Sequence, residues 1–357
     1  MDQPTTDVRE ALRTIQDPFL GAAFSEYNLA RDVRVTDGAV ALGLVLPVPL
    51  GPVKQSLDAA VRERLAGLPW VSSIDIDWSS NITANSGFGQ SGQPLQGVKN
   101  TVAVASGKGG VGKSTLAVNL TVALHTMGAR VGILDADIYG PNVPGMLGVD
   151  GRPILANDKI QPLYGYGVPV MSMGFLADEG TAMIWRGPMV AQALRQLIED
   201  VDWGQLDYLI VDLPPGTGDA PLSLAQILPL AGAVIVSTPQ EVALQDVRRG
   251  IAMFEKLRVP NLGVVENMSY FVCGNCQERH EIFAHGGAAR AAETAGVPLL
   301  GEIPLDPSIR RGGDQGRPPA ASGADDALGS AYFDAAQHVT AQLSRLNASK
   351  PEPLPVL

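Results

Sequence analysis

The chain has 357 residues, of which 45% are hydrophobic, and a net charge of −11 from 26 Lys and Arg against 37 Asp and Glu. This length predicts one large and one small domain, and the acidic balance argues against nucleic acid as a partner because a phosphate backbone would be repelled. The two cysteines argue against a secreted disulfide scaffold. We find no signal-peptide pattern and no apolar run of membrane-spanning length, so we expect a soluble cytoplasmic protein without a membrane partner.

The first 82 residues predict a small α+β domain. Residues 7–16 suit a short helix, and VRVTDGAVALGLVL has two alternating runs around Asp37-Gly38, a dipeptide favoured by two-residue hairpin turns. Residues 53–65 place apolar side chains at helical spacing, and VSSIDIDW then alternates like a strand. Helix, hairpin, helix and strand together make a unit of ordinary domain size.

The remainder of the chain predicts a linker, a large domain and a tail. Residues 83–99 are rich in Gly, Ser and Gln and predict a flexible linker, with a long surface loop as the alternative. Residues 100–346 alternate short apolar runs with helical segments such as PLSLAQILPLA and ALQDVRRGIAMFEKL. The apolar runs are TVAVA, RVGILD, YLIVDL, AVIVST, LGVVEN and PLLGEI, and they predict a mostly parallel sheet flanked by helices. A last helix near residues 326–345 precedes a frayed tail, residues 347–357.

The run TVAVA leads directly into SGKGGVGKSTLAVNL, a phosphate-binding motif. Gly107, Gly112, Lys113 and Ser114 satisfy GxxxxGK[ST], in which glycines let backbone N–H groups converge on phosphate oxygens. The alternative, a glycine-rich turn that only joins strand to helix, is weak because all four positions are filled. The fold class predicted is therefore an α/β P-loop NTPase preceded by a small α+β domain.

The motif assigns nucleotide-binding roles to a continuous stretch. Lys113 is expected to reach the β- and γ-phosphates of ATP, and the Ser114 hydroxyl to bind Mg²⁺. The predicted ATP-binding residues of this loop are Gly107, Lys108, Gly109, Gly110, Val111, Gly112, Lys113, Ser114 and Thr115.

Acidic residues follow two predicted strands. RVGILDADIYGP places Asp135 and Asp137 at one strand end, and LDYLIVDLPPGTGD places Asp212 at another. Such positions lie on the ligand side of an open α/β sheet, so Asp135 and Asp212 are candidate Mg²⁺ residues. The alternative reading is a helix N-cap or turn residue.

The placement of Lys108 within GKGGVGKST resembles the deviant Walker motif of dimerising ATPases such as the nitrogenase iron protein and the division-site and plasmid-partition ATPases. That resemblance implies that Lys108 reaches across a dimer interface to the nucleotide of the partner. Over roughly residues 98–345, stretches such as DADIYGPNVPGMLG, IWRGPMVAQAL, GVVENMSYFVCGNC and IPLDPSIR are similar to the Mrp/ApbC branch, the iron–sulfur cluster carrier ATPases.

The resemblance to these carriers implies slow ATP hydrolysis by a homodimer. It assigns catalytic roles to Lys108, Lys113 and Asp137, with Asp137 positioning the attacking water, and a second switch to Gly216 and Asp219. It also implies that Asn267 recognises adenine and that Pro304 and Asp306 line the base pocket. The first domain resembles a small domain often fused to such carriers, but PLGP has Gly51 where a PGCP-like turn has cysteine. We therefore expect a docking or regulatory role for that domain.

Cys273 and Cys276 are the two cysteines of the chain, spaced as CxxC. From the residues alone they could form a disulfide, a redox dithiol, a zinc site with His280 and His285, or half of an iron–sulfur site. The resemblance implies the last: a transferable [4Fe–4S] cluster bridged across the homodimer, with apo iron–sulfur proteins and cluster scaffold proteins as partners. The rival is a ParA/MinD-like positioning ATPase acting on DNA or membrane, which predicts a basic surface or a basic carboxy-terminal helix.

Overall fold

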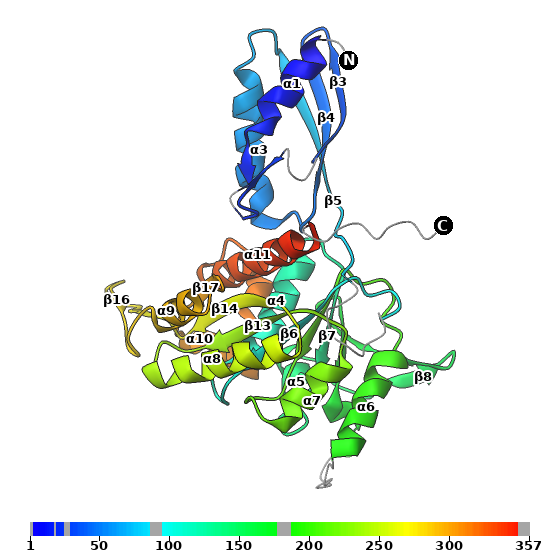
Figure 1. The fold of residues 1–357 in the computed structure, drawn as a ribbon, viewed down its shortest axis with the longest axis vertical. Helices are drawn as coiled ribbons and strands as arrows, with labels where there is room; N and C mark the ends of the chain where they lie inside the picture. Colours follow the sequence, from blue (N-terminus) through cyan, green and yellow to red (C-terminus); the bar gives the residue numbers. More distant parts are fainter. Residues whose placement is uncertain (1–2, 18, 25–28, 86–94, 177–186, 349–357) are drawn as a thin grey trace. The chain divides into compact units, whose positions relative to one another are not determined.

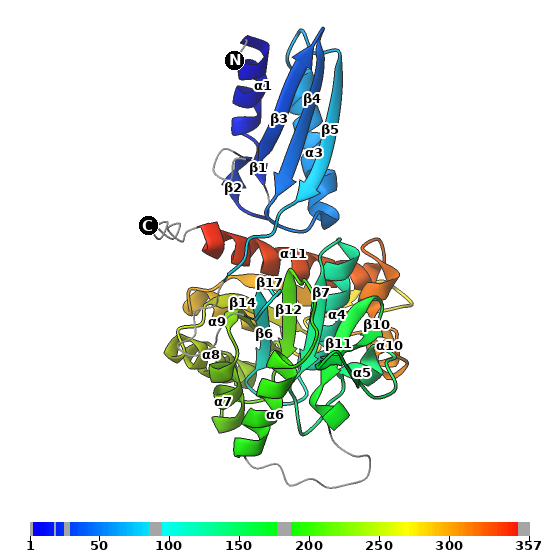
Figure 2. The same cartoon turned by 90° about the vertical axis from the view of Figure 1, so that its right-hand side faces the viewer.

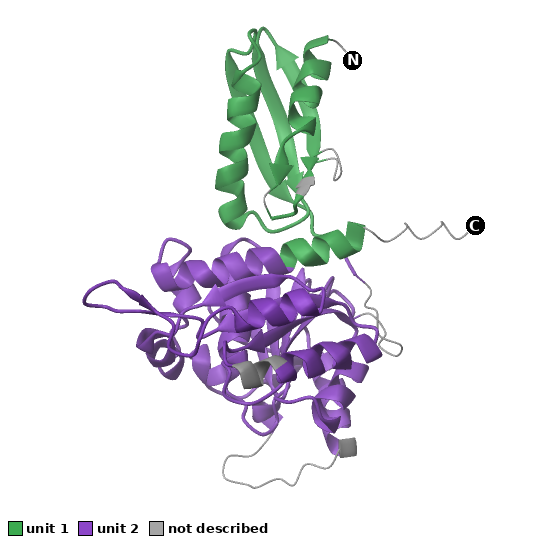
Figure 3. Cartoon of the chain, turned by 60° about the vertical axis from the view of Figure 1, so that its left-hand side comes forward, with its two compact units in different colours: residues 1–83, 340–357 green, residues 84–339 purple. Residues whose placement is uncertain are grey.

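A computed structural model describes residues 3–17, 19–24, 29–85, 95–176 and 187–348 (Figure 1). Most of the predicted linker, the start of the IWRGPMVAQAL stretch and most of the tail lie outside these residues. The chain divides into two compact units, residues 1–83 with 340–357 and residues 84–339 (Figure 3). None of the described helices is both long enough and apolar enough to cross a membrane.

Unit 1 is built on a three-stranded sheet with the order β3-β4-β5. Its elements are α1 (Gln3–Arg13), β1 (Gln16–Asp17), β2 (Ala22–Ala23), β3 (Ala30–Thr36), β4 (Ala39–Leu46), α3 (Gly51–Ala66) and β5 (Ser73–Ser80). The predicted hairpin at Asp37-Gly38 is confirmed, because β3 and β4 pair antiparallel and both turn residues have positive φ angles, 48° and 83°. The predicted helix over 53–65 is confirmed as α3, whose Val53, Leu57 and Val61 are buried.

The carboxy-terminal end of the last helix, α11 (Ala327–Ala348), also belongs to unit 1. Ala341 packs in the same buried cluster as the side chains of α3. The Arg345 guanidinium donates hydrogen bonds to the carbonyl oxygens of Leu20 and Phe19. The core of the small unit is therefore assembled from both ends of the chain.

Unit 2 contains an eight-stranded sheet that confirms the predicted P-loop NTPase architecture (Figure 2). The strand order is β10-β11-β7-β12-β6-β13-β14-β17, and every neighbouring pair is parallel except β10 with β11. The strands are β6 (Thr101–Ser106), β7 (Val131–Asp135), β10 (Leu163–Gly165), β11 (Val168–Ser172), β12 (Tyr208–Asp212), β13 (Leu230–Ser237), β14 (Asn261–Asn267) and β17 (Leu299–Ile303). The apolar runs identified in the sequence form β6, β7, β12, β13, β14 and β17.

Helices flank this sheet (Figures 1 and 2). They are α4 (Lys113–Thr126), α5 (Val143–Met146), α6 (Gly187–Glu199), α7 (Asp219–Ile227), α8 (Glu241–Lys256), α9 (Gly287–Thr294) and α10 (Pro307–Asp314), with 3₁₀ turns η1 (Met173–Leu176) and η2 (Pro319–Ser322). Helix α4 packs against β6, β7 and β12, and α8 packs against β13 and β14. The expected helix over PLSLAQILPLA is wrong at its end, because α7 stops at Ile227 and Leu230 already begins β13. Pro229 explains the stop, since a proline disfavours helical geometry in the residue before it.

Two small hairpins stand apart from the main sheet and were not predicted. One joins β8 (Ile154–Ala156) to β9 (Lys159–Gln161), and the other joins β15 (Phe271–Val272) to β16 (Arg279–His280). The second carries both cysteines in its turn, and we name residues 271–280 the cysteine hairpin.

Asp207 ties together the segments that lead into three central strands. Its carboxylate accepts from the Arg130 guanidinium at 3.0 Å and from the Arg130 backbone N–H at 3.0 Å, and it lies 2.9 Å from Lys99 Nζ. Lys99, Arg130 and Asp207 lie just before β6, β7 and β12, respectively. Burial raises the pKa of Asp207, but the hydrogen bonds from Arg130 and Lys99 outweigh it and lower the pKa to about 2.

We predict that Asp207→Asn destabilises the protein by about 2 kcal/mol at neutral pH, because a carboxyl pKa lowered by nearly two units contributes about that much stability. The contribution is complete above the unfolded-state pKa near 4 and disappears as pH falls to the folded-state pKa near 2. Urea unfolding of both proteins from pH 7 to pH 2 measures the difference. Asp202→Asn, at an exposed neighbouring carboxyl, is the control. A wild-type–variant difference that stays constant over this range contradicts the prediction.

Candidate functional site

The loop between β6 and α4 has the backbone shape that the motif predicts. Gly110 and Gly112 have φ angles of 79° and 83°, in the left-handed region that favours glycine. A Cβ atom on Gly112 would lie 2.0 Å from Asn267 Nδ2, so Asn267 would have to shift and give up its hydrogen bond to the Val111 carbonyl. Gly112 precedes the first turn of α4, so the loop ends where unpaired helix N–H groups and the helix dipole favour an anion.

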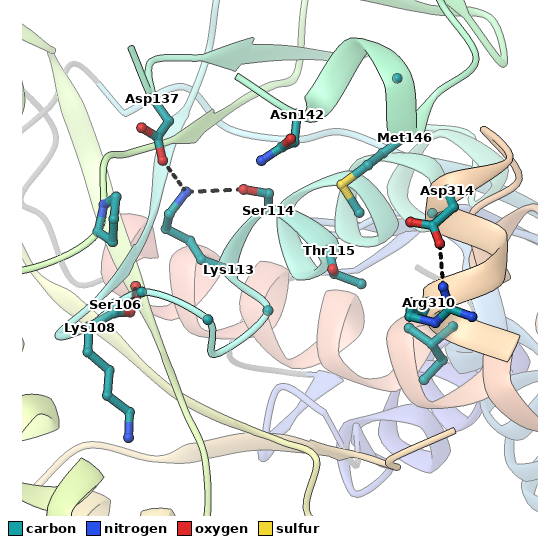
Figure 4. A pocket seen from close by; sticks show the side chains of 17 residues that line it. Ser106, Lys108, Lys113, Ser114, Thr115, Asp137, Asn142, Met146, Arg310 and Asp314 are labelled. Atoms are coloured by element: carbon teal, nitrogen blue, oxygen red, sulfur yellow. Dashed lines mark hydrogen bonds and ion pairs between the residues drawn. The ribbon is translucent and has the colours of Figure 1, made fainter. Parts of the chain in front are cut away.

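A cavity of about 510 Å³ opens beside this loop (Figure 4). One wall is the loop itself and the start of α4, and the opposite wall is formed by α5 and α10. Its lining residues are Ser106, Lys108, Gly109, Gly110, Gly112, Lys113, Ser114, Thr115, Asp137, Asn142, Gly145, Met146, Pro215, Ile309, Arg310, Gly313 and Asp314. The volume falls within the range of small-molecule and cofactor sites.

Lys113 is the electrostatic centre of the cavity. Its ammonium nitrogen lies 2.6 Å from Asp212 Oδ1 and 3.7 Å from Asp137 Oδ2. All three side chains are buried, so the interaction is only weakly screened by water. Lys113 therefore lies between the carboxyl ends of the strands and the glycine loop, within reach of a phosphate group held by that loop.

Ser114 and Asp212 form a pair of oxygen ligands that suits Mg²⁺. The Ser114 hydroxyl donates to Asp212 Oδ2 at 2.5 Å. Burial raises the pKa of Asp212, although the charge of Lys113 and the hydrogen bonds from Lys113 and Ser114 oppose that rise. A second cation would favour the ionised carboxylate further, and hydroxyl and carboxylate oxygens are the ligands that Mg²⁺ prefers.

Asp135 is fully buried and contacts the segment that follows it rather than the cavity. It accepts hydrogen bonds from the backbone N–H groups of Asp137 and Val143, at 3.1 and 3.2 Å, and from the Ser172 hydroxyl at 3.1 Å. Burial and the neighbouring charge of Asp212 raise the pKa of Asp135 to about 7. The structure thus places Asp135 where it shapes the loop carrying Asp137, while Ser114 and Asp212 are in direct contact.

The expected adenine-contacting residues lie around this cavity but do not line it. Asn267 Nδ2 donates to the Val111 carbonyl oxygen at 2.8 Å. Asp306 caps α10 by accepting from the Ser308 backbone N–H at 2.6 Å, and Pro304 is buried at the end of β17. The cavity wall on that side comes from α10, in particular Arg310, which pairs with Asp314 at 2.7 Å (Figure 4). Sequence reasoning missed Arg310 as a lining residue, although it ends the IPLDPSIR stretch.

Lys108 points away from Lys113, and the two side chains leave opposite sides of the loop (Figure 4). Its ammonium nitrogen lies 3.4 Å from Gln240 Oε1. The contact is long and its acceptor is an uncharged amide, so a carboxylate or phosphate oxygen would be a stronger partner for Lys108.

The cysteine hairpin is closed by backbone hydrogen bonds around its turn. The Cys273 N–H donates to the Glu278 carbonyl and the Gln277 N–H to the Cys273 carbonyl, each at 2.9 Å. Both thiols are free, and Cys276 is exposed. Hydrogen bonds from the backbone N–H groups of Cys276 and Asn275, and from the Cys276 thiol, lower the pKa of Cys273. The turn therefore presents two adjacent thiols, and the lowered pKa of Cys273 favours its thiolate, the form that binds metal.

The two histidines of the possible zinc site lie apart. His280 lies with Cys276 and Glu278, and His285 with Glu266 and Glu302; within each trio the ligand atoms are less than 4.8 Å from one another. In the part of the chain that the structure describes, no such group combines both cysteines with both histidines. The geometry gives no support to a four-ligand zinc site within one chain.

Comparison with family models gives two matches. One, described as NUBPL iron-transfer P-loop NTPase, covers residues 97–340. The other, described as iron-sulfur cluster assembly protein, covers residues 5–76.

Individual proteins resemble the chain to different extents. An iron-sulfur cluster carrier protein from Synechocystis is 44% identical over 347 residues, which is 95% of this chain and 98% of that protein. A solved nucleotide-binding protein from Archaeoglobus fulgidus in complex with ADP is 39% identical, with a TM-score of 0.59, over 67% of this chain and 92% of that one. The cell division ATPase MinD from Pyrococcus furiosus is 25% identical, with a TM-score of 0.52, over 67% and 98% of the two chains.

We predict that Gly112→Ala abolishes nucleotide binding, because the added methyl would collide with Asn267 and distort the loop that holds the phosphates. Gly128→Ala is the matched control, since Gly128 also has a positive φ angle, 89°, but nothing lies within 4 Å of an added Cβ. The control should lose about 1 kcal/mol of stability through backbone strain and keep its affinity. Calorimetric titration with ADP measures both, and normal affinity in Gly112→Ala contradicts the prediction.

Proposed function

Because this chain belongs to the NUBPL family of iron-transfer P-loop NTPases, we propose that it is an iron–sulfur cluster carrier. In this proposal it binds and hydrolyses ATP, holds a transferable [4Fe–4S] cluster across a homodimer, takes the cluster from scaffold proteins and delivers it to apo-proteins. The observation that carries the proposal is the accessible thiol pair Cys273 and Cys276, presented on the same unit as the nucleotide cavity.

The number of thiols supports a shared cluster. One chain offers two cysteines, whereas an iron–sulfur cluster usually takes four thiolate ligands. A twofold axis places identical residues of two chains side by side, so two hairpins complete the set. The exposed turn suits a cargo that has to leave again, and free thiols suit a reducing cytoplasm.

The relatives favour a carrier over a positioning ATPase. The Synechocystis protein named as a carrier matches nearly the whole chain, including the small first unit, whereas the MinD structure matches only about two thirds of it at lower identity. A net charge of −11 also opposes binding to DNA or to an anionic membrane surface.

Each of the charged residues at the cavity has its own role in ATP hydrolysis. Lys113 exchanges its carboxylate partners for β- and γ-phosphate oxygens, and Asp137 orients the attacking water. Ser114 and Asp212 would hold Mg²⁺, which would neutralise phosphate charge. Lys108 leaves Gln240 and contacts the nucleotide of the partner chain, where its positive charge stabilises the charge that develops on the transferred phosphoryl group.

Anaerobic reconstitution should give about one [4Fe–4S] cluster per two chains, as four ligands per cluster require. Cys273→Ser and Cys276→Ser should each abolish the cluster and leave ADP affinity unchanged, because the cysteines do not line the nucleotide cavity. Iron and sulfide analysis with absorption spectra measures the outcome. His285→Ala is the control and should retain the cluster. One zinc ion per chain that depends on His280 and His285 would replace the proposal.

Lys108→Met should lower the ATP turnover rate about 1000-fold or more, as removal of a trans-acting charge does in related phosphoryl transfer. ADP affinity of the same variant should stay within a factor of two, because Lys108 contacts Gln240 rather than the residues that hold the phosphates. Lys113→Met is the comparison and should lose both properties. Phosphate release and ADP titration separate the two cases, and normal turnover in Lys108→Met argues against action in trans.

A further inference from the structure

We propose that Arg279 is a positioning residue that fixes the cysteine hairpin against the carboxyl ends of β14 and β17, and so sets where the two thiols are presented. The effect of this positioning on iron–sulfur cluster binding rests on the proposed function. The contacts that support it are independent of any cluster.

The position of Arg279 in the hairpin determines the position of Cys273. In the cysteine hairpin, Arg279 of β16 pairs directly with Val272 of β15, and Val272 precedes Cys273. The turn that follows is closed by the Cys273 and Gln277 backbone hydrogen bonds. A shift of Arg279 relative to the sheet therefore shifts both ends of the thiol-bearing turn together.

The guanidinium of Arg279 makes three contacts with residues outside the hairpin. Its central carbon lies 3.9 Å from the centroid of the Tyr270 ring, a cation–π distance. Its Nη2 lies 3.8 Å from Glu302 Oε2 and 3.4 Å from His285 Nδ1. A planar cation can stack on a ring and face an anion at its edge at the same time, which a lysine cannot do.

The backbone that carries Tyr270 is held by hydrogen bonds to the residues at the end of β17. The Tyr270 carbonyl accepts from the Leu305 N–H at 2.7 Å, and the Ser269 N–H donates to the Ile303 carbonyl at 2.9 Å. The buried Glu266 carboxylate accepts from the Ser269 hydroxyl at 2.7 Å and from the Ala288 N–H at 2.6 Å. Through Tyr270, Arg279 thus connects an exposed ribbon to a segment whose backbone is hydrogen-bonded to the residues at the end of β17.

The same strand end touches the phosphate loop. Asn267 follows Glu266 at the end of β14, and its amide donates to the Val111 carbonyl. One short segment, residues 266–270, therefore contacts the nucleotide loop through Asn267 and the cysteine hairpin through Tyr270. Arg279 fixes the second of these contacts.

The competing explanation for this group of side chains is a metal site. The ligand atoms of Glu266, His285 and Glu302 lie within 4.8 Å of one another, as the ligands of one metal ion would. Two observations favour the arginine. Both oxygens of Glu266 already accept hydrogen bonds, and the Arg279 guanidinium already supplies positive charge beside His285 and Glu302. A divalent cation would have to displace that charge.

The test is hydrogen exchange in the full-length, metal-free protein, at the amides of Cys273 and Gln277 that close the turn. Arg279→Met should speed their exchange about two- to fivefold, the effect expected for an exposed cation–π contact. Arg279→Lys should fall between wild type and Arg279→Met, since it keeps the charge but not the planar stack. Global unfolding and ADP affinity should not change. Arg249→Met, at an exposed arginine of α8 paired with Asp246, is the control.

Wild-type exchange rates in Arg279→Met overturn the proposal. So does a uniform increase throughout unit 2, which indicates general destabilisation rather than positioning. In reconstituted protein, Arg279→Met should bind the same amount of cluster as wild type and lose it to a chelator faster. If faster exchange is confirmed but wild type binds no cluster, the carrier function fails and the positioning role of Arg279 stands.

Discussion

The nucleotide site depends on the buried ammonium of Lys113, which pairs with the carboxylates of Asp212 and Asp137. Asp135 ends β7, Asp137 lies two residues beyond it and Asp212 ends β12. Several buried carboxylates beside one lysine leave excess negative charge in a poorly solvated place, which is costly unless protons or further cations compensate it. Burial is the main cause of the raised pKa values of Asp135 and Asp212, and a neighbouring carboxylate adds to each rise. A site of this kind favours a ligand that arrives with its own divalent cation.

The end of β14 connects this electrostatic centre to the periphery of the same unit. Glu266 and Asn267 are neighbours in the chain, but their side chains bind different segments. Glu266 accepts hydrogen bonds from Ser269 and from the first turn of α9, whereas Asn267 donates to the phosphate loop. Both are buried and hydrogen-bonded, so neither can move without breaking a contact in the core. The loop geometry around Gly112 therefore depends on a strand far from it in sequence.

The sequence predicted the structure best where backbone geometry or burial alone determines which residue type can occupy a position. The Asp37-Gly38 turn, the six buried runs and the glycine loop followed from backbone geometry and burial. Strand β11 was missed because Pro169 and the glycines around it break the apolar run on which recognition depends. The contacts of Asp306 and Arg310 could not be predicted, since strand-end spacing does not say which face of α10 turns toward the cavity. The role of Arg279 was not predicted, because nothing in the spacing of Tyr270, His285 and Glu302 shows that they meet at one guanidinium.

The thiols are carried by a two-stranded ribbon and not by a core strand or helix. Bending such a ribbon alters the separation of its tip from any facing surface while the packed interior stays as it is, because few buried contacts are at stake. Substitutions along residues 271–280 would thus change the position of the two thiols at little cost in folding stability. The placement of the thiols and the stability of the fold can in this way change separately as sequences diverge.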